Sequence, residues 1–188
     1  FPDQQARTTV RVRVGNHGEA RLSTAPTWFS QDVGGTFTAD WGDFDGDGDL
    51  DLVLGGSRGA VVYENLGGEL QGRETLDTLA YGVHWVDLDN DNQMELVAIG
   101  KSDGGNPMEP GTNYVYRWNG NKFEKADSFS SDYQLVRAVS GDFNGDGYAD
   151  LIVSTNGINV PCGVQLYTNT YTLDSSTFFD ESVCVSNR

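Results

Sequence analysis

The chain has 188 residues, of which 12 are Lys or Arg and 28 are Asp or Glu, so its formal net charge is −16. A surface this acidic repels phosphate backbones and anionic lipid heads, so nucleic acids and membrane surfaces are not expected partners, and cations are favoured. No apolar run approaches the roughly 18 residues that a membrane span needs. The 24 glycines fall between short apolar runs, which predicts an all-β chain with many turns.

The N-terminal segment predicts a β-hairpin. Apolar and basic residues alternate from Val10 to Val14, a turn of Gly and Asn follows at 15–18, and a second run covers 19–23. Four of the 12 basic residues fall within the first 21 positions, so the hairpin either docks on an acidic partner chain or is a solvated outer strand. We assign residues 1–27 to this docking or ring-closing element and residues 28–188 to the rest of the chain.

Three acidic clusters farther along share one pattern, with oxygen-bearing side chains at loop positions 1, 3, 5 and 9. Each cluster runs into an apolar stretch, and each copy then has a second short run with a Tyr and an Asn. A period of this length is typical of a repeated supersecondary unit. The residues are Asp43, Asp45, Asp47 and Asp51; Asp87, Asp89, Asp91 and Glu95; and Asp142, Asn144, Asp146 and Asp150.

This spacing predicts calcium binding. Oxygens at alternate positions of a tight loop converge on one point, and Ca²⁺ takes six to eight oxygen ligands in irregular geometry. The loops contain neither Cys nor His, so zinc and copper lack their preferred ligands. Position 6 has to turn sharply, which Gly48 and Gly147 permit and Asn92 tolerates. Position 7 is expected to bind through its backbone carbonyl. The residues at position 7 are Asp49, Gln93 and Tyr148.

An EF-hand loop also begins this way, but it needs a Glu at position 12, where these loops have Leu54, Ala98 and Val153. The segments 41–52 and 140–151 instead resemble the FG-GAP or VCBS repeat family, the integrin-alpha-like β-propeller repeat. The resemblance covers about residues 30–170, with 87–95 a looser copy. It implies four-stranded antiparallel blades in which the calcium loop joins the two innermost strands, and three Ca²⁺ ions per chain.

The expected blades run from Thr36 to Leu76, from Leu79 to Phe129 and from Tyr133 to Phe179. Propellers usually need at least four blades to close. The N-terminal hairpin together with residues 182–186 would complete a fourth blade within one chain, or two copies would pair to close a larger ring. The sequence leaves both open, so the fold expected is a partial or small β-propeller.

Several aromatic and histidine residues invite a sharper reading. Trp41 and Trp85 precede the first loop ligand by two residues, and we expect them to pack between blades rather than stack on sugars. Neither His17 nor His84 has a nucleophile placed beside it by the sequence, so catalysis is not expected. The Gly- and Pro-rich insertion at 101–113 is either a binding loop or a tolerated excursion.

The two cysteines, Cys162 and Cys184, are expected to form a disulfide, with two free thiols as the alternative. Together with calcium, a disulfide favours an extracellular setting. The chain starts at Phe1 without a Met, so we expect it to be processed or excised from a longer protein.

The sequence therefore predicts an extracellular, calcium-binding β-propeller module with a structural or adhesive role in protein–protein assembly, and no enzyme. The expected partners are other protein chains, including copies of this one, bound through the N-terminal hairpin. Three alternatives remain. One is a lectin-like propeller that binds glycans, another is the non-catalytic scaffold of a larger secreted enzyme, and the third is a filament or surface-layer subunit.

Overall fold

The computed structural model describes residues 28–30, 35–100, 111–131, 135–155, 162–172 and 178–185. The chain divides into two compact units, residues 1–32 and 33–188, and the architecture below is that of the second unit. The predicted N-terminal hairpin and most of the insertion at 101–113 lie outside the described residues. The predicted boundary between residues 1–27 and 28–188 stays a prediction.

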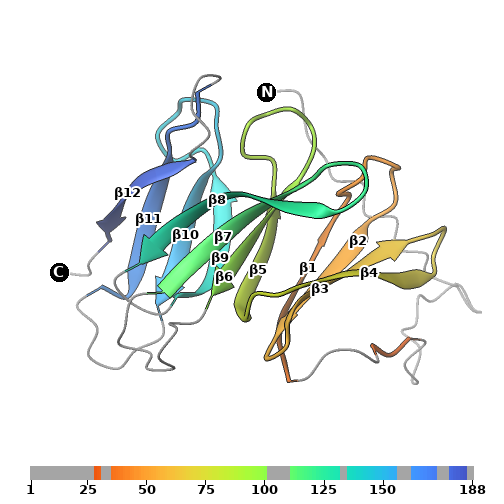
Figure 1. Cartoon of the computed structure of the whole chain (residues 1–188). Helices are drawn as coiled ribbons and strands as arrows, with labels where there is room; N and C mark the ends of the chain where they lie inside the picture. Colours follow the sequence, from red (N-terminus) through yellow and green to blue (C-terminus); the bar gives the residue numbers. More distant parts are fainter. Residues whose placement is uncertain are drawn as a thin grey trace, which may run out of the picture. The chain divides into compact units, whose positions relative to one another are not determined.

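The described residues form three antiparallel sheets, each with four strands in sequential order (Figure 1). The first sheet contains β1 (Thr36–Gly42), β2 (Asp51–Gly56), β3 (Gly59–Asn65) and β4 (Leu70–Leu76). The second contains β5 (Ala80–Val86), β6 (Glu95–Gly100), β7 (Gly111–Trp118) and β8 (Phe123–Ser131). The third contains β9 (Leu135–Gly141), β10 (Asp150–Thr155), β11 (Val164–Asn169) and β12 (Phe179–Cys184).

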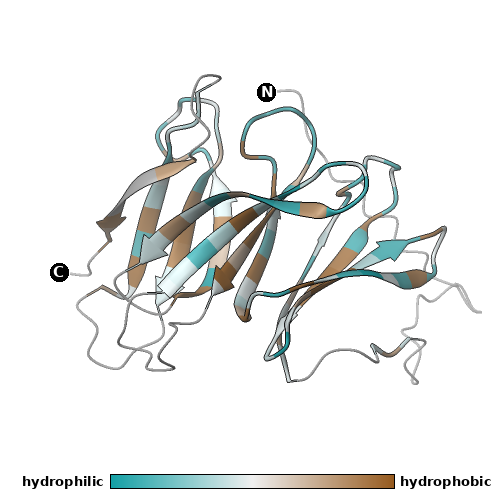
Figure 2. Ribbon diagram, viewed as in Figure 1, coloured by the Kyte–Doolittle hydropathy of each residue, from teal (hydrophilic) through white to brown (hydrophobic). Residues whose placement is uncertain are grey.

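The apolar stretch that follows each acidic cluster forms the second strand of each sheet. β2 and β6 are buried along their whole length, as a short continuous apolar run predicts for a strand covered on both faces. β1 and β4 have a more exposed pattern. Hydrophobic residues accordingly gather on the inner strands of each sheet (Figure 2). In the described parts of the chain, no helix is long and apolar enough to cross a membrane.

The first two sheets pack face to face. We call the face that carries Val53 and Val62 the front face of the first sheet, and the opposite face its back face; the same terms apply to the equivalent faces of the other sheets. The front face of the first sheet packs against Trp85, Leu96 and Tyr116 on the back face of the second. A Cβ at Gly42 would lie 2.6 Å from the Trp85 ring, so this glycine permits the ring to lie against β1.

The second and third sheets repeat the arrangement. Val97 and Val115, on the front face of the second sheet, share a core with Leu151 and Tyr167 on the back face of the third. Phe129 meets the Tyr167 ring edge-on, with ring centroids 4.8 Å apart. The front faces of the first and second sheets therefore each pack against the back face of the next sheet along the chain.

The prediction of an all-β chain made of four-stranded antiparallel sheets is confirmed. The sheets are blade-like, and the described residues do not close a propeller ring. One expectation is wrong: residues 182–184 belong to β12, the last strand of the third sheet, rather than to a fourth blade. The buried Phe178 and Phe179 hold the start of β12 in the core, and a Cys162–Cys184 disulfide ties its end to the turn before β11.

Candidate metal centres

Each acidic cluster forms the loop between the first and second strands of its sheet. The loops run from 43 to 50, from 87 to 94 and from 142 to 149, and the residue at position 9 begins the second strand. Position 2 is apolar in all three loops. Phe44 and Leu88 are buried in the cores between sheets, whereas Phe143 is exposed. A buried anchor on one side and a strand on the other hold the first two loops in place.

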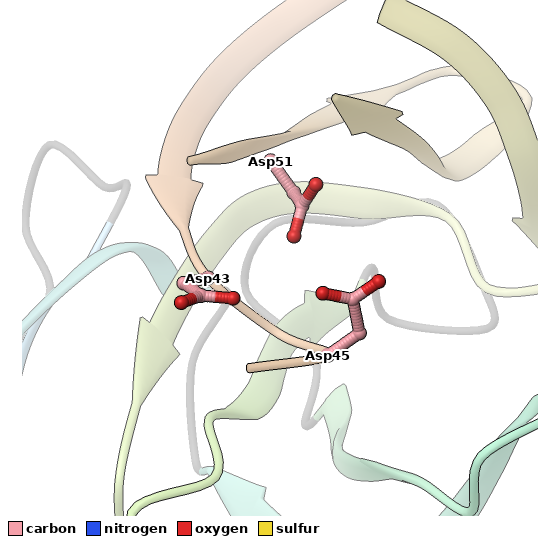
Figure 3. A group of neighbouring side chains, drawn as sticks. All are labelled: Asp43, Asp45 and Asp51. Carbon is pink, nitrogen blue, oxygen red and sulfur yellow. The ribbon is translucent and has the colours of Figure 1, made fainter. Parts of the chain in front are cut away.

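The first loop brings three carboxylates together. Asp43, Asp45 and Asp51 offer oxygen atoms that all lie within 4.8 Å of one another, and their side chains point toward one another (Figure 3). Both oxygens of Asp43 accept backbone N–H groups, from Gly46 at 2.8 Å and Gly48 at 3.0 Å. Such closely spaced oxygens suit a hard cation such as Ca²⁺.

Asp51 fixes the loop to the sheet. It is completely buried, and its two oxygens accept the backbone N–H groups of Phe44 at 3.1 Å and Asn65 at 2.8 Å. Burial raises the pKa of Asp51 to about 7, against the opposing effect of these two hydrogen bonds. A cation near these oxygens would stabilise the ionised form and reverse that shift.

The third loop repeats the hydrogen bonds of the first. Asp142 accepts the N–H groups of Gly145 and Gly147 at 2.6 and 3.0 Å, and Asp150 accepts those of Phe143 and Asn169 at 2.9 and 2.7 Å. Asn144 stands where the first loop has its second carboxylate. The third loop therefore offers an amide oxygen there, which is also an ordinary calcium ligand.

The second loop brings Asp87, Asp89 and Glu95 within the same 4.8 Å. Its backbone turns at Asn90 and Asn92, which have φ angles of 61° and 68°. The left-handed turn predicted at Asn92 is therefore present. Asp87 accepts the Asn92 N–H at 3.1 Å, and Glu95 is completely buried, which raises its pKa to about 7.

Other predicted ligands stabilise the loops through hydrogen bonds. At position 5, Asp47, Asp91 and Asp146 each accept the backbone N–H of position 7, at 2.7–2.9 Å. These aspartates lie outside the two carboxylate groups described above. At position 7, Asp49 accepts the Gly67 N–H at 3.1 Å. Binding through the backbone carbonyls of Asp49, Gln93 and Tyr148 stays a prediction.

Two asparagines support the loops in a way that sequence reasoning did not assign. Asn65 Nδ2 donates to the Leu50 carbonyl at 2.9 Å, and Asn169 Nδ2 donates to the carbonyls of Ala149 and Leu88 at 3.1 and 2.8 Å. The repeated Tyr and Asn pattern in the sequence was the signal for this role. Asn169 also connects the third sheet to the second loop.

A family model described as the FG-GAP-like repeat matches residues 43–98 and 99–153, more than half of the chain. The chain belongs to the FG-GAP-like repeat family. Each matched FG-GAP-like repeat includes strands of two neighbouring sheets, because the first match begins at the first acidic loop and ends in β6. FG-GAP-like repeats are typical of β-propeller-type protein–protein interaction modules. No curated protein matches the chain.

A separate hydrogen-bond network connects the first strands of the three sheets. His84 Nδ1 lies 2.9 Å from Asp40 Oδ2, and His84 Nε2 lies 2.9 Å from the Ser140 hydroxyl. The carboxylate accepts only, so Nδ1 donates to Asp40, and an Nε2 atom without a proton accepts from Ser140. Burial raises the pKa of Asp40, but hydrogen bonds from His84 and the Trp85 N–H outweigh it and hold this pKa below its ordinary value. Sequence reasoning did not foresee Ser140 beside His84.

Proposed function

We propose that this FG-GAP-like chain is a calcium-stabilised, extracellular β-propeller-type module with a structural or adhesive role and no catalytic activity. It associates with further protein through the front face of its third sheet. The observation that carries this proposal is a difference in exposure between equivalent residues of the three sheets.

The front face of the third sheet is apolar and open. Val139, Ile152, Leu166 and Val183 are directly paired across its four strands. Val139, Val183 and Phe143 are 60, 61 and 69% exposed. Ile152 is 37% exposed, whereas its counterparts Val53 and Val97 are fully buried. Phe143 corresponds to Phe44, which is 1% exposed. Leu166 is buried, like its counterparts Val62 and Val115. An exposed row of this kind marks an interaction site.

The occupant that fits this face is the first sheet of a second copy. Between the first two sheets, the front face of the first sheet packs against a row of the second sheet, namely Trp85, Leu96 and Tyr116. The back face of the first sheet carries the same kind of row, Trp41, Leu52 and Tyr63. Trp41 is 53% exposed, whereas Leu52 and Tyr63 are already buried within the chain. Through Trp41, a second copy can therefore repeat, head to tail, part of the contact that the first two sheets make within one chain.

A charge placed on the open face tests this association. Val183→Asp is expected to weaken self-association roughly tenfold or more, because an unpaired carboxylate would be buried in the contact. Leu66→Asp, at an exposed apolar residue in the β3–β4 turn, is the matched control and should associate like the parent chain. Sedimentation velocity over a concentration series measures both. Equal association of the two variants, or a parent chain that stays monomeric, would contradict the proposal.

Calcium is supported by the donor sets of the loops. In the first and third loops the side-chain ligands would be Asp43, Asp45, Asp47 and Asp51, and Asp142, Asn144, Asp146 and Asp150. A bound Ca²⁺ would supply the positive charge that lets these crowded carboxylates stay ionised. The chain's own contribution is to hold the oxygens close together and to anchor the position 9 carboxylates. The expectation of three ions per chain stays a prediction.

The extracellular setting is supported by the Cys162–Cys184 disulfide, whose Cα atoms lie 5.6 Å apart, since disulfides persist mainly in oxidising compartments. Docking through the N-terminal hairpin, glycan binding and a scaffold or filament role stay predictions. Deletion of residues 1–25 and a calcium-dependent glycan-binding screen would test the first two.

A second candidate function, acyl transfer at Ser140, is favoured by the hydrogen-bond order Asp40, His84, Ser140, which is that of a Ser-His-Asp triad. In such a reaction, Ser140 Oγ would bond to an ester carbonyl carbon as its proton passes to His84 and then to the leaving alcohol, and water would release the acid. A fluorophosphonate probe should then label the parent chain but not Ser140→Ala. If the probe does not label the parent chain, this candidate is rejected. The hydrogen-bond network of Asp40, His84 and Ser140 then only connects the sheets.

A further inference from the structure

Arg117 lies in β7 and reaches into the second acidic loop. Its Nη2 atom lies 2.5 Å from Asp89 Oδ2, and its Nε atom lies 3.0 Å from Glu95 Oε1. The two carboxylate side chains are 6 and 0% exposed. Both belong to the carboxylate group that Asp87 completes. A guanidinium, which stays protonated in proteins, therefore already supplies positive charge to this group.

The equivalent positions in the other sheets carry no positive charge. Arg117 follows Tyr116, and the residues that follow the equivalent tyrosines are Glu64 in the first sheet and Thr168 in the third. Neither side chain is a cation. The first and third loops therefore have no arginine at the place from which Arg117 enters the second loop.

The anchoring of the position 9 carboxylate differs in the same way. In the first and third loops, one oxygen of Asp51 and of Asp150 accepts the backbone N–H of an asparagine, Asn65 or Asn169. Trp118 stands at that position in the second sheet, and Glu95 Oε1 accepts from Arg117 instead. The second loop is thus built around a side-chain cation.

We propose that Arg117 is the resident cation of the second loop, and that this loop does not take up Ca²⁺ at concentrations that fill the first and third loops. The inference rests on the proposed calcium function of those two loops. To enter, Ca²⁺ would have to displace a guanidinium that is held by two buried carboxylates, and such charged hydrogen bonds are among the strongest in proteins. The guanidinium also lies 5.7 Å from the centre of the Phe178 ring, which adds a cation–π contact.

Removal of this arginine should open a calcium site. The buried Asp87 Oδ1 atom has no hydrogen-bond partner among the described residues, so the second loop already has an oxygen available for a cation. Without Arg117, no positively charged side chain in the described part of the chain would pair with these three carboxylates. Arg117→Gln is therefore expected to gain a calcium ion and to depend on calcium for stability in this loop.

Native mass spectrometry across a calcium titration tests the inference on the full chain. The parent chain is expected to bind two ions per chain and Arg117→Gln three. Arg58→Gln, at an exposed arginine in the β2–β3 turn, is the matched control and should bind two. If Arg117→Gln folds only with calcium, it is purified in calcium and the ions are counted there.

Thermal unfolding provides a second readout. Added calcium should raise the melting temperature of Arg117→Gln by more than that of the parent chain. Three ions of similar affinity in the parent chain, or two in both chains, would overturn the role of Arg117 while leaving calcium binding intact. A chain that binds none in any variant would overturn the calcium function itself, and the inference with it.

Discussion

Asp51 is an acid with no exposed surface and with both oxygens committed to backbone donors. Glu95 occupies the same loop position in the second sheet and is equally buried. Burial raises the pKa of each to about 7. Because the ionised forms are disfavoured in the folded, metal-free chain, these two residues make its stability depend on pH.

The sign of this dependence follows from proton binding. Between about pH 4 and pH 7 the folded chain binds more protons than the unfolded chain at these two sites, so stability falls as the pH rises through this window. Asp40, whose pKa is lowered, acts in the opposite sense but below pH 4. In chelator, the free energy of unfolding measured with urea is expected to fall between pH 5 and pH 7.5, by at most about 1.4 kcal/mol per pH unit for each group.

Asp51→Asn is expected to give a shallower slope, because the amide has no proton to lose. The measurement is urea unfolding of the parent chain and the variant at several pH values, with and without calcium. A midpoint of the parent chain that rises or stays flat between pH 5 and pH 7.5 in chelator would contradict the buried-acid account.

Residues were unequally predictable from the sequence. The repeated spacing located Asp43, Asp45 and Asp51 because their convergence depends only on local loop geometry. Arg117 was not found, because it reaches its partners across the sheet from another strand, 22 and 28 residues away in sequence. Ser140 was missed for the same reason, since its contact with His84 spans 56 residues.

The three loops are equivalent elements with unequal packing, which gives a matched pair of substitutions. Phe44 lies in the core between the first two sheets, with its ring centroid 5.0 Å from that of Trp118. Phe143 occupies the same loop position and is 69% exposed. Phe44→Ala should cost about 3–5 kcal/mol of unfolding free energy, whereas Phe143→Ala should cost less than about 0.5 kcal/mol.

Chemical denaturation in calcium, at a protein concentration where the chain is monomeric, measures both. Equal losses for the two variants would mean that the open face of the third sheet is already packed within one chain. A loss confined to Phe44→Ala is the expected result.

Strand number and order within a sheet were predictable because each acidic loop is followed by an apolar run and a turn. The last strand of the third sheet was not predictable in this way. The connection from β11 to β12 is longer than a hairpin turn, so the sequence does not indicate which residues pair. The packing of Trp85 between sheets was foreseen, but the matching Trp41 is half-exposed. Both lie on the back face of their sheet, but among the described residues no sheet precedes the first one to cover Trp41.

At the scale of the whole molecule, front and back faces alternate along the chain, and the third sheet ends the series with an open front face. We predict that calcium stabilises the first and third loops, that Arg117 stabilises the second, and that copies of the chain associate head to tail. Contact between unlike faces gives a ring if the rotation closes and a filament if it does not.

Native mass spectrometry of the calcium-loaded full chain tests this account most directly, because it counts ions and subunits in one spectrum. The account predicts assemblies of two or more copies, each copy with two calcium ions. A metal-free monomer would contradict it, and a monomer with two ions would contradict the association of copies.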